Sequence, residues 1–542
     1  MIRSAFMVPL FLLCAPVAVQ AAPPVAAPPG VHLLTLEDRS LARAEPTHTV
    51  GFHDRSARRV KIRHSADGWA KPHPMQREGR VWRISVDDLD LEPGLHAFKF
   101  LINGRWEAGE NRMLYINDEG LIDYPPALYL TWQRDPTTTM TIHWHTDHPD
   151  DPSVIQYRAK GDDEWRRAQG DKTEFPFTDR WIHTVELTGL TPNRRYEFRR
   201  DDAPKGYTFQ TMPDTLDAPL RFVTGGDIYH EKEWMDAMNR RAAALDPAFV
   251  VIGGDLAYAD GLPENAGRWH VYFESFYHHL VAPDGRMIPQ VVAVGNHEMR
   301  DHFLFWHDDY EPTTEWRERV APYFFNLFAF PGHPGYNVLD FADYMSIVFL
   351  DTMHLNTIKD EQLEWMKPVF ADRKDRPHLF PVYHVPAYPS NRNPDDLVNT
   401  EIREYWLPVF EAAGVRLAFE NHDHTFKVTH PIRAGKIHPN GIVFIGDGAW
   451  GVDVRPVDDR WYLRTAESVR HLFEIVIEPD RRTVRALTAD GRILDTFEQP
   501  TPATRHPTPD TRHPTPFPKL ASPRKMHTML NFTCAIQHRG QR

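Results

Sequence analysis

The chain has 542 residues, which exceeds what one hydrophobic core holds and predicts about two to four domains. Hydrophobic residues make up 41% and aromatic residues 12% of it, as in ordinary globular proteins. The net charge of −13 and the pI near 6.1 argue against a nucleic-acid-binding surface or a basic membrane patch. An anionic substrate would therefore need local attraction, which bound metal ions can supply.

The first 21 residues predict a secretory signal peptide. Arg3 precedes a short apolar run that Pro9 and Pro16 interrupt, and small residues suit cleavage after Ala21. A lipoprotein signal through Cys14 stays open, although "FLLC" lacks the small residue expected before the cysteine. We therefore expect a secreted or periplasmic protein. No later segment resembles a transmembrane helix.

The remaining terminal segments are compositionally biased. Residues 22–30 form a Pro/Ala-rich linker, and residues 499–542 repeat "RHPTP" and predict a disordered tail. Cys14 and Cys534 are the two cysteines, so the mature chain has no internal disulfide and no cysteine metal site. A secreted chain of this kind suggests a bacterial periplasmic or exported protein.

Residues 31–120 predict an all-β module, because short alternating runs such as "VWRISV" and "HAFKFLI" are separated by "DG", "EPG" and "NG" turns. The block resembles the β-sandwich glycogen-binding modules of starch and glycogen enzymes. That resemblance implies glycan contact through Trp69, Lys99 and Trp106, whose order and spacing match the family's sugar platform. The alternative is that Trp69, Trp82 and Trp106 are ordinary core or edge residues of a sandwich.

Residues 121–214 predict a second β-sandwich. Alternating strands such as "TMTIHWHT" and the corner "GLTPNRRYEF" resemble a fibronectin type III domain. Without a ligand motif, this block is expected to have a structural role.

From residue 219 to residue 498 the pattern changes to an α/β domain. Short, nearly continuous apolar strands such as "FVVI", "VVAV" and "GIVFI" alternate with helical stretches such as "EKEWMDAMNRRAAAL". The fold class predicted for the whole chain is therefore multidomain: two N-terminal β-sandwiches followed by an α/β domain whose sheets lie between helices. Sites in such sheets lie at the carboxyl ends of the strands.

Ligand-type side chains follow five of these strands. "LRFVT" leads to Asp227, "FVVI" to "GGDLAYADG", "VVAV" to "GNHE", "LFPVYH" ends in a histidine, and "VRLAFE" leads to "NHDH". Each piece alone is more often a turn, a helix cap or a solvated histidine, but the ordered set predicts a metal site. The candidate ligands are Asp227, Asp255, Tyr258, Asn296, His384, His422 and His424.

The set has too many ligands for one ion and suits two ions that share a carboxylate, as in two-metal hydrolases. Oxygen donors from Asp and Tyr suit trivalent iron, whereas imidazole and amide suit zinc, manganese or ferrous iron. A metal ion explains the tyrosine in "GDLAYADG", which is Tyr258. With an unperturbed pKa of about 10, this side chain needs a strong Lewis acid nearby to be a tyrosinate, so Tyr258 is expected to be a metal ligand.

From about Pro125 to Gly451 these ordered motifs resemble the purple acid phosphatases, within the calcineurin-like metallophosphoesterases. The motifs "GDLAYADG" and "GNHE" carry most of the resemblance, and "HVPAY" supports it. By position, the resemblance implies an Fe(III) site at Asp227, Asp255, Tyr258 and His424, and a Zn, Mn or Fe(II) site at Asp255, Asn296, His384 and His422. Asp255 would be the bridge.

The resemblance also implies catalytic roles for His297 and Asp255. His297 matches the family histidine that touches the phosphate or protonates the leaving group, and Asn296 would also contact substrate. The family nucleophile is a metal-bound hydroxide.

Three departures from the family pattern leave substrate choice open. Asn421 stands where the family's last motif has glycine. The family's first motif usually has glycine two residues after the aspartate, and here Tyr229 occupies that place, followed by His230. We expect Tyr229 to line the pocket or support a ligand. The loop "PSNRNPDD" replaces a paired-histidine loop, so Arg392 is a candidate phosphate contact, with a solvated loop arginine as the alternative.

The segment from Phe303 to Phe330 is rich in aromatic residues. It either walls the pocket around the organic part of a substrate or, as is commoner, packs between helix and sheet.

These observations predict a secreted, binuclear phosphoesterase that hydrolyses phosphomonoesters. A phosphodiesterase or a nucleotide-directed enzyme on the same metal site is the alternative. A carbohydrate-binding surface protein with a degenerate phosphoesterase domain is an alternative from another class, and the complete set of inferred ligands argues against it.

Overall fold

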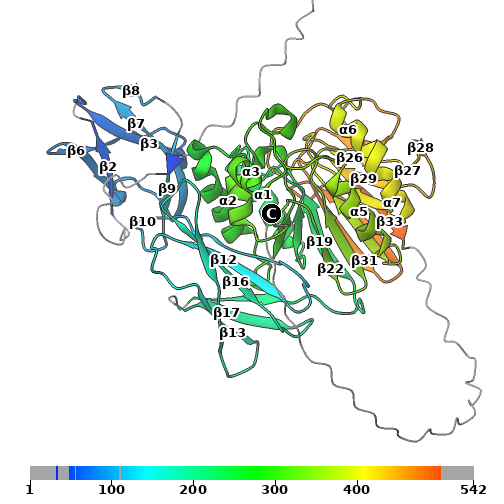
Figure 1. Ribbon diagram of the computed structural model, residues 1–542. Coiled ribbons are helices and arrows are strands. Elements are labelled where there is room, and N and C mark those ends of the chain that lie inside the picture. Colours follow the sequence, from blue (N-terminus) through cyan, green and yellow to red (C-terminus); the bar gives the residue numbers. More distant parts are fainter. Residues whose placement is uncertain are drawn as a thin grey trace, which may run out of the picture. The chain divides into compact units, whose positions relative to one another are not determined.

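The computed structural model describes residues 48–501, apart from 55, 109, 110, 202 and 204, together with the two-residue strand β1 (His32–Leu33) (Figure 1). The predicted signal peptide and linker lie outside these residues, as does the predicted tail beyond Thr501. Gln499 and Pro500, predicted as the start of the tail, instead end the strand β33 (Ile493–Pro500), because they pair with Arg482 and Arg481. Within the described part of the chain, no helix combines the length and the apolar character that a membrane span requires.

The first module has two β-sheets around a core that includes Trp82, Phe98 and Phe100. Alternation is clear in β3 (Val60–His64), where Val60, Ile62 and His64 are buried between less buried neighbours. The smaller sheet consists of β2 (Thr49–His53), β6 (Val81–Ser85) and β5 (Gln76–Glu78). The larger consists of β1, β9 (Arg112–Ile116), β7 (Gly94–Ile102), β3 (Val60–His64) and β4 (His73–Pro74), with β8 (Arg105–Trp106) on β7 and β10 (Ile122–Asp123) on β9.

The first module extends slightly beyond the predicted boundary at residue 120. Strand β10 pairs with β9, so Ile122 and Asp123 belong to the first module. The turn between β9 and β10 is closed by Asn117, whose side-chain oxygen accepts hydrogen bonds from the backbone N–H groups of Glu119 and Leu121. An Asx turn of this kind makes a hairpin from a segment that has few β-forming residues.

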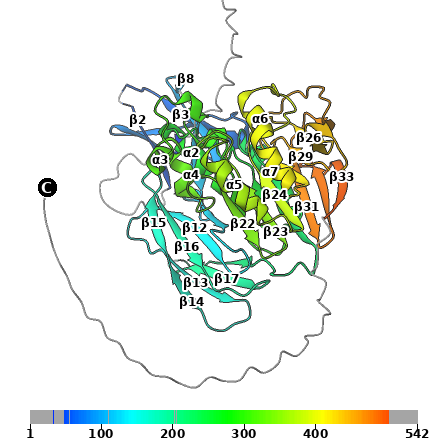
Figure 2. The same cartoon turned by 45° about the vertical axis from the view of Figure 1, so that its right-hand side comes forward.

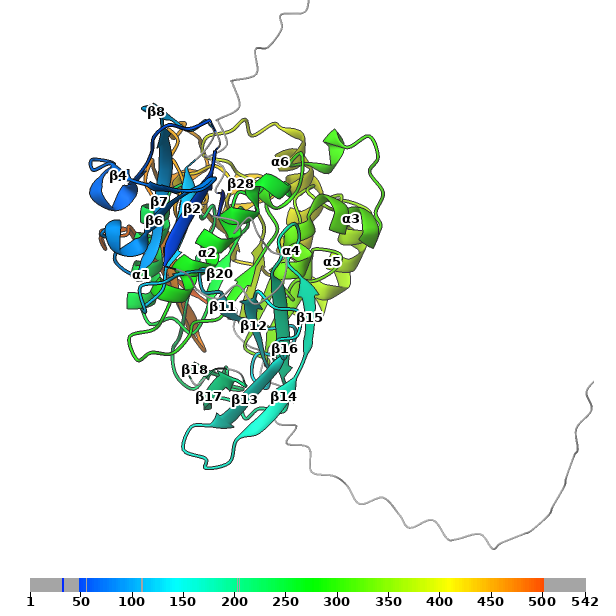
Figure 3. The same ribbon diagram turned by 90° about the vertical axis from the view of Figure 1, so that its left-hand side faces the viewer.

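The second block consists of two four-stranded antiparallel sheets, which Figure 3 shows beside each other. Tyr196 forms the predicted corner, since its hydroxyl accepts a hydrogen bond from the backbone N–H of Thr191 at 2.9 Å. One sheet is ordered β11 (Leu128–Thr131), β12 (Met140–Thr146), β16 (Trp181–Leu187), β15 (Asp171–Glu174). The other is ordered β14 (Arg166–Gln169), β13 (Val154–Ala159), β17 (Arg195–Arg200), β18 (Gly206–Gln210).

The α/β domain contains two larger sheets, and this confirms the predicted fold class. The first is ordered β21 (Gln290–Val292), β20 (Val250–Ile252), β19 (Leu220–Gly225), β31 (Leu472–Glu478), β32 (Arg481–Leu487), β33 (Ile493–Pro500). The second is ordered β22 (Asn337–Phe341), β23 (Met345–Phe349), β24 (His378–Val382), β25 (Leu417–Phe419), β29 (Val443–Gly446), β26 (Phe426–Thr429), β30 (Leu463–Glu467).

Phenylalanine side chains pack the two sheets of this domain against each other. Phe222 of β19 lies 5.9 Å from the ring of Phe380 in β24 and 6.2 Å from that of Phe419 in β25, measured between ring centroids. All three are at most 2% exposed. Strands buried on both faces explain why the sequence shows continuous apolar runs here rather than alternation.

Helices cover the outer faces of this pair of sheets (Figure 1). The segment predicted from "EKEWMDAMNRRAAAL" forms α1 (Lys232–Ala244), which packs on α2 (Ala266–His279). Figure 2 shows α5 (Glu361–Ala371) and α7 (Leu407–Ala412) across the strands of the second sheet. The other α-helices of the described residues are α3 (Thr314–Val320), α4 (Pro322–Leu327) and α6 (Leu397–Glu401).

The second sandwich is joined to the α/β domain by buried contacts. The Tyr129 hydroxyl donates to the carbonyl oxygen of Leu327 at 2.6 Å, and the ring of Trp132 meets that of Phe249 edge-on at 5.7 Å. Trp132 is completely buried. The sandwich therefore shares a continuous apolar core with the α/β domain.

The core of the second sandwich also holds a buried histidine, His183. Its two ring nitrogens lie 2.8 Å from the Thr146 hydroxyl and 2.9 Å from the Ser153 hydroxyl, and the ring stacks on Trp144 at 4.7 Å. Burial lowers the pKa of His183 to about 4.

Acid should destabilise the protein through this residue. An unfolded histidine has a pKa of about 6.5, so the unfolded state takes up the proton first as the pH falls. The resulting loss is at most about 1.4 kcal/mol per pH unit between pH 6.5 and 4. We expect the urea midpoint of His183→Gln to change less between pH 7 and pH 5 than that of the wild type. His148→Gln, at a side chain that is 35% exposed in the same sandwich, is the matched control for a histidine-to-glutamine substitution.

Candidate metal centre

The predicted ligands lie on loops that follow strands of both sheets in the α/β domain. In the first sheet, β19, β20 and β21 are parallel neighbours. In the second, β24 and β25 are parallel neighbours. The loops after these five strands carry all seven predicted ligands: Asp227, Asp255, Tyr258, Asn296, His384, His422 and His424.

One group of donors forms around Asp227. The Tyr258 hydroxyl lies 3.2 Å from Asp227 Oδ1, and His424 Nε2 lies 3.0 Å from the same oxygen. Tyr258 and His424 are themselves 3.1 Å apart. Together with Asp255, the Asp227 and His424 side chains offer ligand atoms within 4.8 Å of one another.

A second group forms on the other side of Asp255. His384 Nε2 lies 3.1 Å from Asp255 Oδ2 and 3.1 Å from Asn296 Oδ1. His422 Nδ1 lies 3.1 Å from the same His384 nitrogen. Asp255 belongs to both groups, which is the arrangement that two ions with a bridging carboxylate require.

The backbone at five of the seven ligands is left-handed, with φ between +54° and +81°. This region is sparsely populated by residues other than glycine and costs about 1–3 kcal/mol per residue. Its concentration at one site indicates that the surrounding structure forces the side chains to converge. The five are Asp227, Asp255, Tyr258, His422 and His424.

Backbone carbonyl groups orient two of the histidines. His384 Nδ1 lies 2.9 Å from Gly253 O, and His424 Nδ1 lies 3.1 Å from Asp453 O. These partners assign the proton to Nδ1 and leave Nε2 of each ring free to bind a metal. Gly448 leaves room for the Asp227 carboxylate, since a Cβ atom at position 448 would lie 1.6 Å from Asp227 Oδ2.

Glu298 joins the loops that follow β20 and β21, a role that the sequence analysis missed. Its carboxylate accepts hydrogen bonds from the backbone N–H groups of Asp255 at 2.7 Å, Leu256 at 2.8 Å and Gly295 at 2.7 Å. Burial raises its pKa to about 8. The glutamate of "GNHE" thus fixes the position of Asp255.

The donor set fits metal cations on electrostatic grounds. Burial raises the pKa of Asp227 to about 7, and the neighbouring Asp255 contributes to the shift. Burial, with Asp227 and Asp255, also raises the pKa of Tyr258 well above its usual value. Bound cations would compensate for this buried negative charge and favour the ionised ligands.

His297 lies beside the two groups and is paired with Asp260, which the sequence analysis did not select. His297 Nδ1 lies 2.5 Å from Asp260 Oδ1, and His302 Nε2 lies 3.4 Å from the same oxygen. Although burial raises it, hydrogen bonds to His297 and His302 lower the pKa of Asp260 to about 2. An ionised Asp260 orients His297. The second acid of "GGDLAYADG" was the available sequence signal.

The residues that depart from the family pattern lie around the donors. The Arg268 guanidinium lies over the ring of Tyr229, 4.4 Å from its centroid, so this tyrosine supports the loop that carries Asp227. His230 lies against Tyr258, with 4.5 Å between ring centroids. Asn421 is 2% exposed, donates to Tyr383 O at 3.1 Å, and packs against Gly226 and Gly253, where any Cβ atom would collide with it.

Two arginines border the His422–His424 segment. Arg392 pairs with Asp423 at 3.3 Å and is 37% exposed, so it is neither buried nor fully solvated. Arg455 was not predicted, and its backbone N–H donates to His424 O at 3.0 Å. Burial lowers the pKa of His424, and the positive charge of Arg455 lowers it further, which places a second guanidinium near the donors. Its position in the loop after "GIVFI" was the only sequence signal.

A buried ion cluster supports the same segment from behind. Lys427 Nζ lies 2.6 Å from Glu420 Oε2 and 2.7 Å from Asp447 Oδ1, and all three side chains are fully buried. His424 N–H donates to Asp447 O at 2.8 Å. The cluster therefore positions the end of the histidine motif.

The aromatic segment from Phe303 to Phe330 divides into two parts. Trp316, Phe324 and Phe328 are at most 2% exposed and belong to the core, as the commoner alternative expects. Phe305 and Trp306 are 43% and 59% exposed, beside the candidate metal centre.

The proposed sugar-contact residues lie together on the first module. Trp106, 49% exposed, meets Trp69 edge-on at 6.2 Å. Lys99 is directly opposite Arg63 in the neighbouring strand, and the Arg63 guanidinium lies 5.8 Å from the Trp106 ring. Trp82, in contrast, is a core residue.

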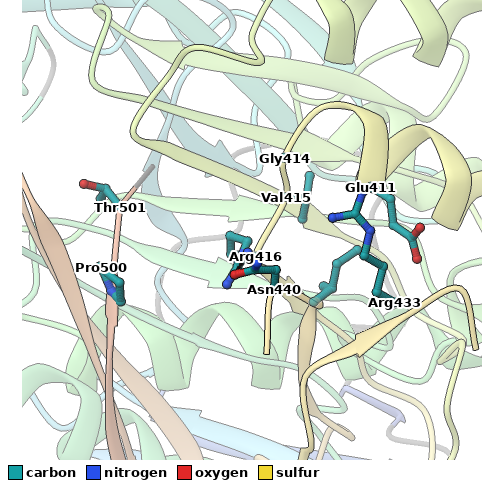
Figure 4. Close-up of a pocket in the computed structure, with 9 residues that line it drawn as sticks. Glu411, Gly414, Val415, Arg416, Arg433, Asn440, Pro500 and Thr501 are labelled. Carbon is teal, nitrogen blue, oxygen red and sulfur yellow. Dashed lines mark hydrogen bonds between the residues drawn. The ribbon is translucent and has the colours of Figure 1, made fainter. Parts of the chain in front are cut away.

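A cavity of about 320 Å³ lies elsewhere in the α/β domain, where the end of β33 meets the turn after α7 (Figure 4). Arg416 and Asn440 are within 3.5 Å of each other there. None of the predicted ligands lines this cavity. It is therefore separate from the candidate metal centre.

Comparison with known families identifies both domains that bear on the site. Residues 125–211 match the purple acid phosphatase N-terminal domain, and residues 221–426 match the calcineurin-like phosphoesterase domain. The start of the first match agrees with the end of β10 at Asp123.

Two relatives cover much of the chain. Purple acid phosphatase 18 of Arabidopsis thaliana is 24% identical over 322 residues, which is 57% of this chain and 68% of that protein. An uncharacterized protein of Mycobacterium tuberculosis is 24% identical over 405 residues, which is 65% of this chain and 69% of that protein.

The solved structure of purple acid phosphatase PPD1 from yellow lupin seeds has the same fold. It aligns with a TM-score of 0.59 and 14% identity over 80% of this chain and 83% of that chain. The two domain matches and the purple acid phosphatase relatives show that the chain is a hydrolase.

The shared position of Asp255 makes a prediction about metal stoichiometry. Asp255→Ala should lose both ions, because each candidate group needs this carboxylate, whereas His424→Ala should lose one. Metal content per chain after dialysis, measured by plasma emission spectrometry, checks this. Both variants must keep the wild-type circular dichroism spectrum. Two ions retained by Asp255→Ala would contradict the bridging assignment.

Proposed function

We propose that this chain, a calcineurin-like phosphoesterase with a purple acid phosphatase N-terminal domain, hydrolyses phosphomonoesters with the help of two metal ions. The observation that carries the proposal is the pair of buried donor groups that share Asp255 beside His297. A complete donor set also argues against the alternative of a carbohydrate-binding protein with a degenerate phosphoesterase domain.

The chemistry of the donors suggests which ions bind. Asp227, Asp255, Tyr258 and His424 would hold Fe(III), and Asp255, Asn296, His384 and His422 would hold Zn, Mn or Fe(II). A pair of such ions supplies Lewis-acid catalysis: it lowers the pKa of water and neutralises charge on phosphoryl oxygens.

The protein's own residues would orient the substrate and move a proton. His297 donates a proton to the leaving-group oxygen, and Asp260 holds the ring for this step through the 2.5 Å contact at Nδ1. The backbone N–H of His297 donates to Asp255 Oδ1 at 2.8 Å, and this fixes His297 relative to both donor groups. Asn296 contributes a further substrate contact.

Arg392 is proposed to bind phosphate oxygens. It lies next to His422, with Nη2 3.5 Å from the His422 carbonyl oxygen, and its guanidinium remains partly exposed. A guanidinium can contact two phosphate oxygens at once. Arg455 flanks the same segment and would add positive charge for an anionic substrate.

The first test compares a chromogenic phosphomonoester with its diester analogue on metal-loaded protein. We expect a higher initial rate on the monoester, and loss of that rate after chelation, with recovery when metal is restored. A higher rate on the diester would favour the alternative of a phosphodiesterase or nucleotide-directed enzyme. No hydrolysis of either ester by protein with two bound ions would contradict the proposal.

The iron assignment has its own spectroscopic test. If Tyr258 binds Fe(III), the oxidised protein should have a visible charge-transfer band, and Tyr258→Phe should abolish it. Tyr229→Phe is the matched control, because this ring stacks on Arg268 and should leave the band unchanged. A colourless, fully active protein with two divalent ions would overturn the iron assignment and leave the hydrolase assignment intact.

Two further proposals concern the rest of the chain. The signal-peptide pattern of residues 1–21 supports secretion or export to the periplasm. The edge-on pair of Trp69 and Trp106, with Lys99 on the adjacent strand, supports a glycan contact on the first module. Aromatic rings offer a surface on which the C–H faces of a sugar can stack.

A further inference from the structure

A series of ring contacts leads from His297 to exposed aromatic side chains. The His302 ring lies 4.6 Å from that of His297, and the Trp306 ring lies 6.3 Å from that of His302. Phe303 lies 5.4 Å from Trp306 and 6.3 Å from His422. The aromatic group therefore adjoins the candidate metal centre.

Three residues make up this aromatic border: Phe303, Phe305 and Trp306. The rings of Phe303 and Phe305 stack at 5.1 Å, and Phe305 meets Trp306 edge-on at 5.5 Å. Phe305 and Trp306 are 43% and 59% exposed, although two adjoining large aromatic rings would gain free energy by burial. An exposed aromatic cluster beside a catalytic centre suggests contact with a ligand.

The backbone holds the border in place. Leu304, between Phe303 and Phe305, is 6% exposed, and its N–H donates to Met353 O at 3.0 Å. His302 O lies 3.0 Å from His354 Nδ1, and His307 Nε2 lies 2.8 Å from Arg300 O. Because the loop is anchored on both sides of Leu304, the exposed rings are preorganised for binding.

The position of His297 determines which part of the substrate meets this border. In the proposed function, the phosphoryl group would lie at the candidate metal centre, and His297 would protonate the leaving oxygen. The ring contacts from His297 to His302 and from His302 to Trp306 give the leaving group a path, so it would extend from His297 past His302 toward Trp306. The other border, at Arg392 and Arg455, is cationic and suits phosphate oxygens instead.

We propose that Phe305 and Trp306 bind a planar aromatic ring in the leaving group, so that phosphoesters of ring-bearing alcohols are the preferred substrates. This inference rests on the proposed function. Offset or edge-to-face contact with two aromatic rings favours an aromatic ring over a saturated one of similar size by about five- to tenfold.

The test compares benzyl phosphate with cyclohexylmethyl phosphate, whose leaving alcohols differ mainly in the aromaticity of the ring. We expect the wild type to have the higher kcat/KM on benzyl phosphate. Trp306→Ala should reduce the benzyl-to-cyclohexylmethyl ratio of kcat/KM about fivefold. Trp306→Phe should restore most of the ratio, since it keeps an aromatic ring.

Trp461→Ala is the matched control, because Trp461 is 55% exposed in the same domain and its ring contacts are with Tyr388 and Tyr462. It should keep the wild-type ratio. An unchanged ratio in Trp306→Ala, with both esters still hydrolysed, would overturn the inference.

A binding measurement separates failure of this inference from failure of the proposed function. If the wild type hydrolyses neither ester nor the chromogenic phosphomonoester, the proposed function fails. Calorimetry with benzylphosphonate and cyclohexylmethylphosphonate then tests the ring contact directly, on metal-loaded wild type and on Trp306→Ala. Preference for the benzyl compound that is lost in the variant supports the contact, and equal binding of both compounds by the wild type overturns it.

Discussion

The buried carboxylate of Asp255 is the constraint on which the rest of this site depends. It is 1% exposed and belongs to both candidate donor groups. Glu298 fixes it by accepting backbone hydrogen bonds from the loops that follow β20 and β21. A carboxylate shared by two ions tolerates little displacement, because each ion needs its own ligands at fixed distance. Five of the candidate ligands have left-handed backbone, which such a requirement would explain.

Charge compensation explains much of the surrounding structure. Two carboxylates and a phenol are buried together, and burial alone disfavours their ionised forms. The protein supplies histidines at the centre and arginines at its border, and metal cations would complete the balance. Behind the histidine motif, Lys427 lies between Glu420 and Asp447 with all three charges buried. Such a cluster adds little net stability, but it holds the adjacent backbone in one position.

The two borders of the centre differ in chemistry. Arg392 and Arg455 flank the His422–His424 segment, whereas Phe305 and Trp306 extend from the side of His297. Both borders are loops on a rigid pair of sheets, so they can differ among relatives without disturbing the metal ligands. In the proposed function, substrate selection would therefore depend on the loops, and the hydrolytic chemistry would depend on the strand ends.

The α/β class, the helix α1 and the loops that carry the candidate ligands could be inferred from local sequence patterns. Short apolar runs mark strands buried on both faces, and the loops after parallel strands meet at one edge of a sheet. Ligand types after five such strands could therefore be recognised without coordinates.

Which side chains meet across loops depends on the tertiary fold, and no local pattern in the sequence reveals it. Asp260 pairs with His297 from a loop 37 positions earlier, and Lys427 is buried although a lysine in a strand usually faces solvent. The antiparallel strands β31 to β33 and the division of the aromatic segment were equally unpredictable. These features depend on long-range packing and on charges that are distant in sequence, and local periodicity carries no record of either.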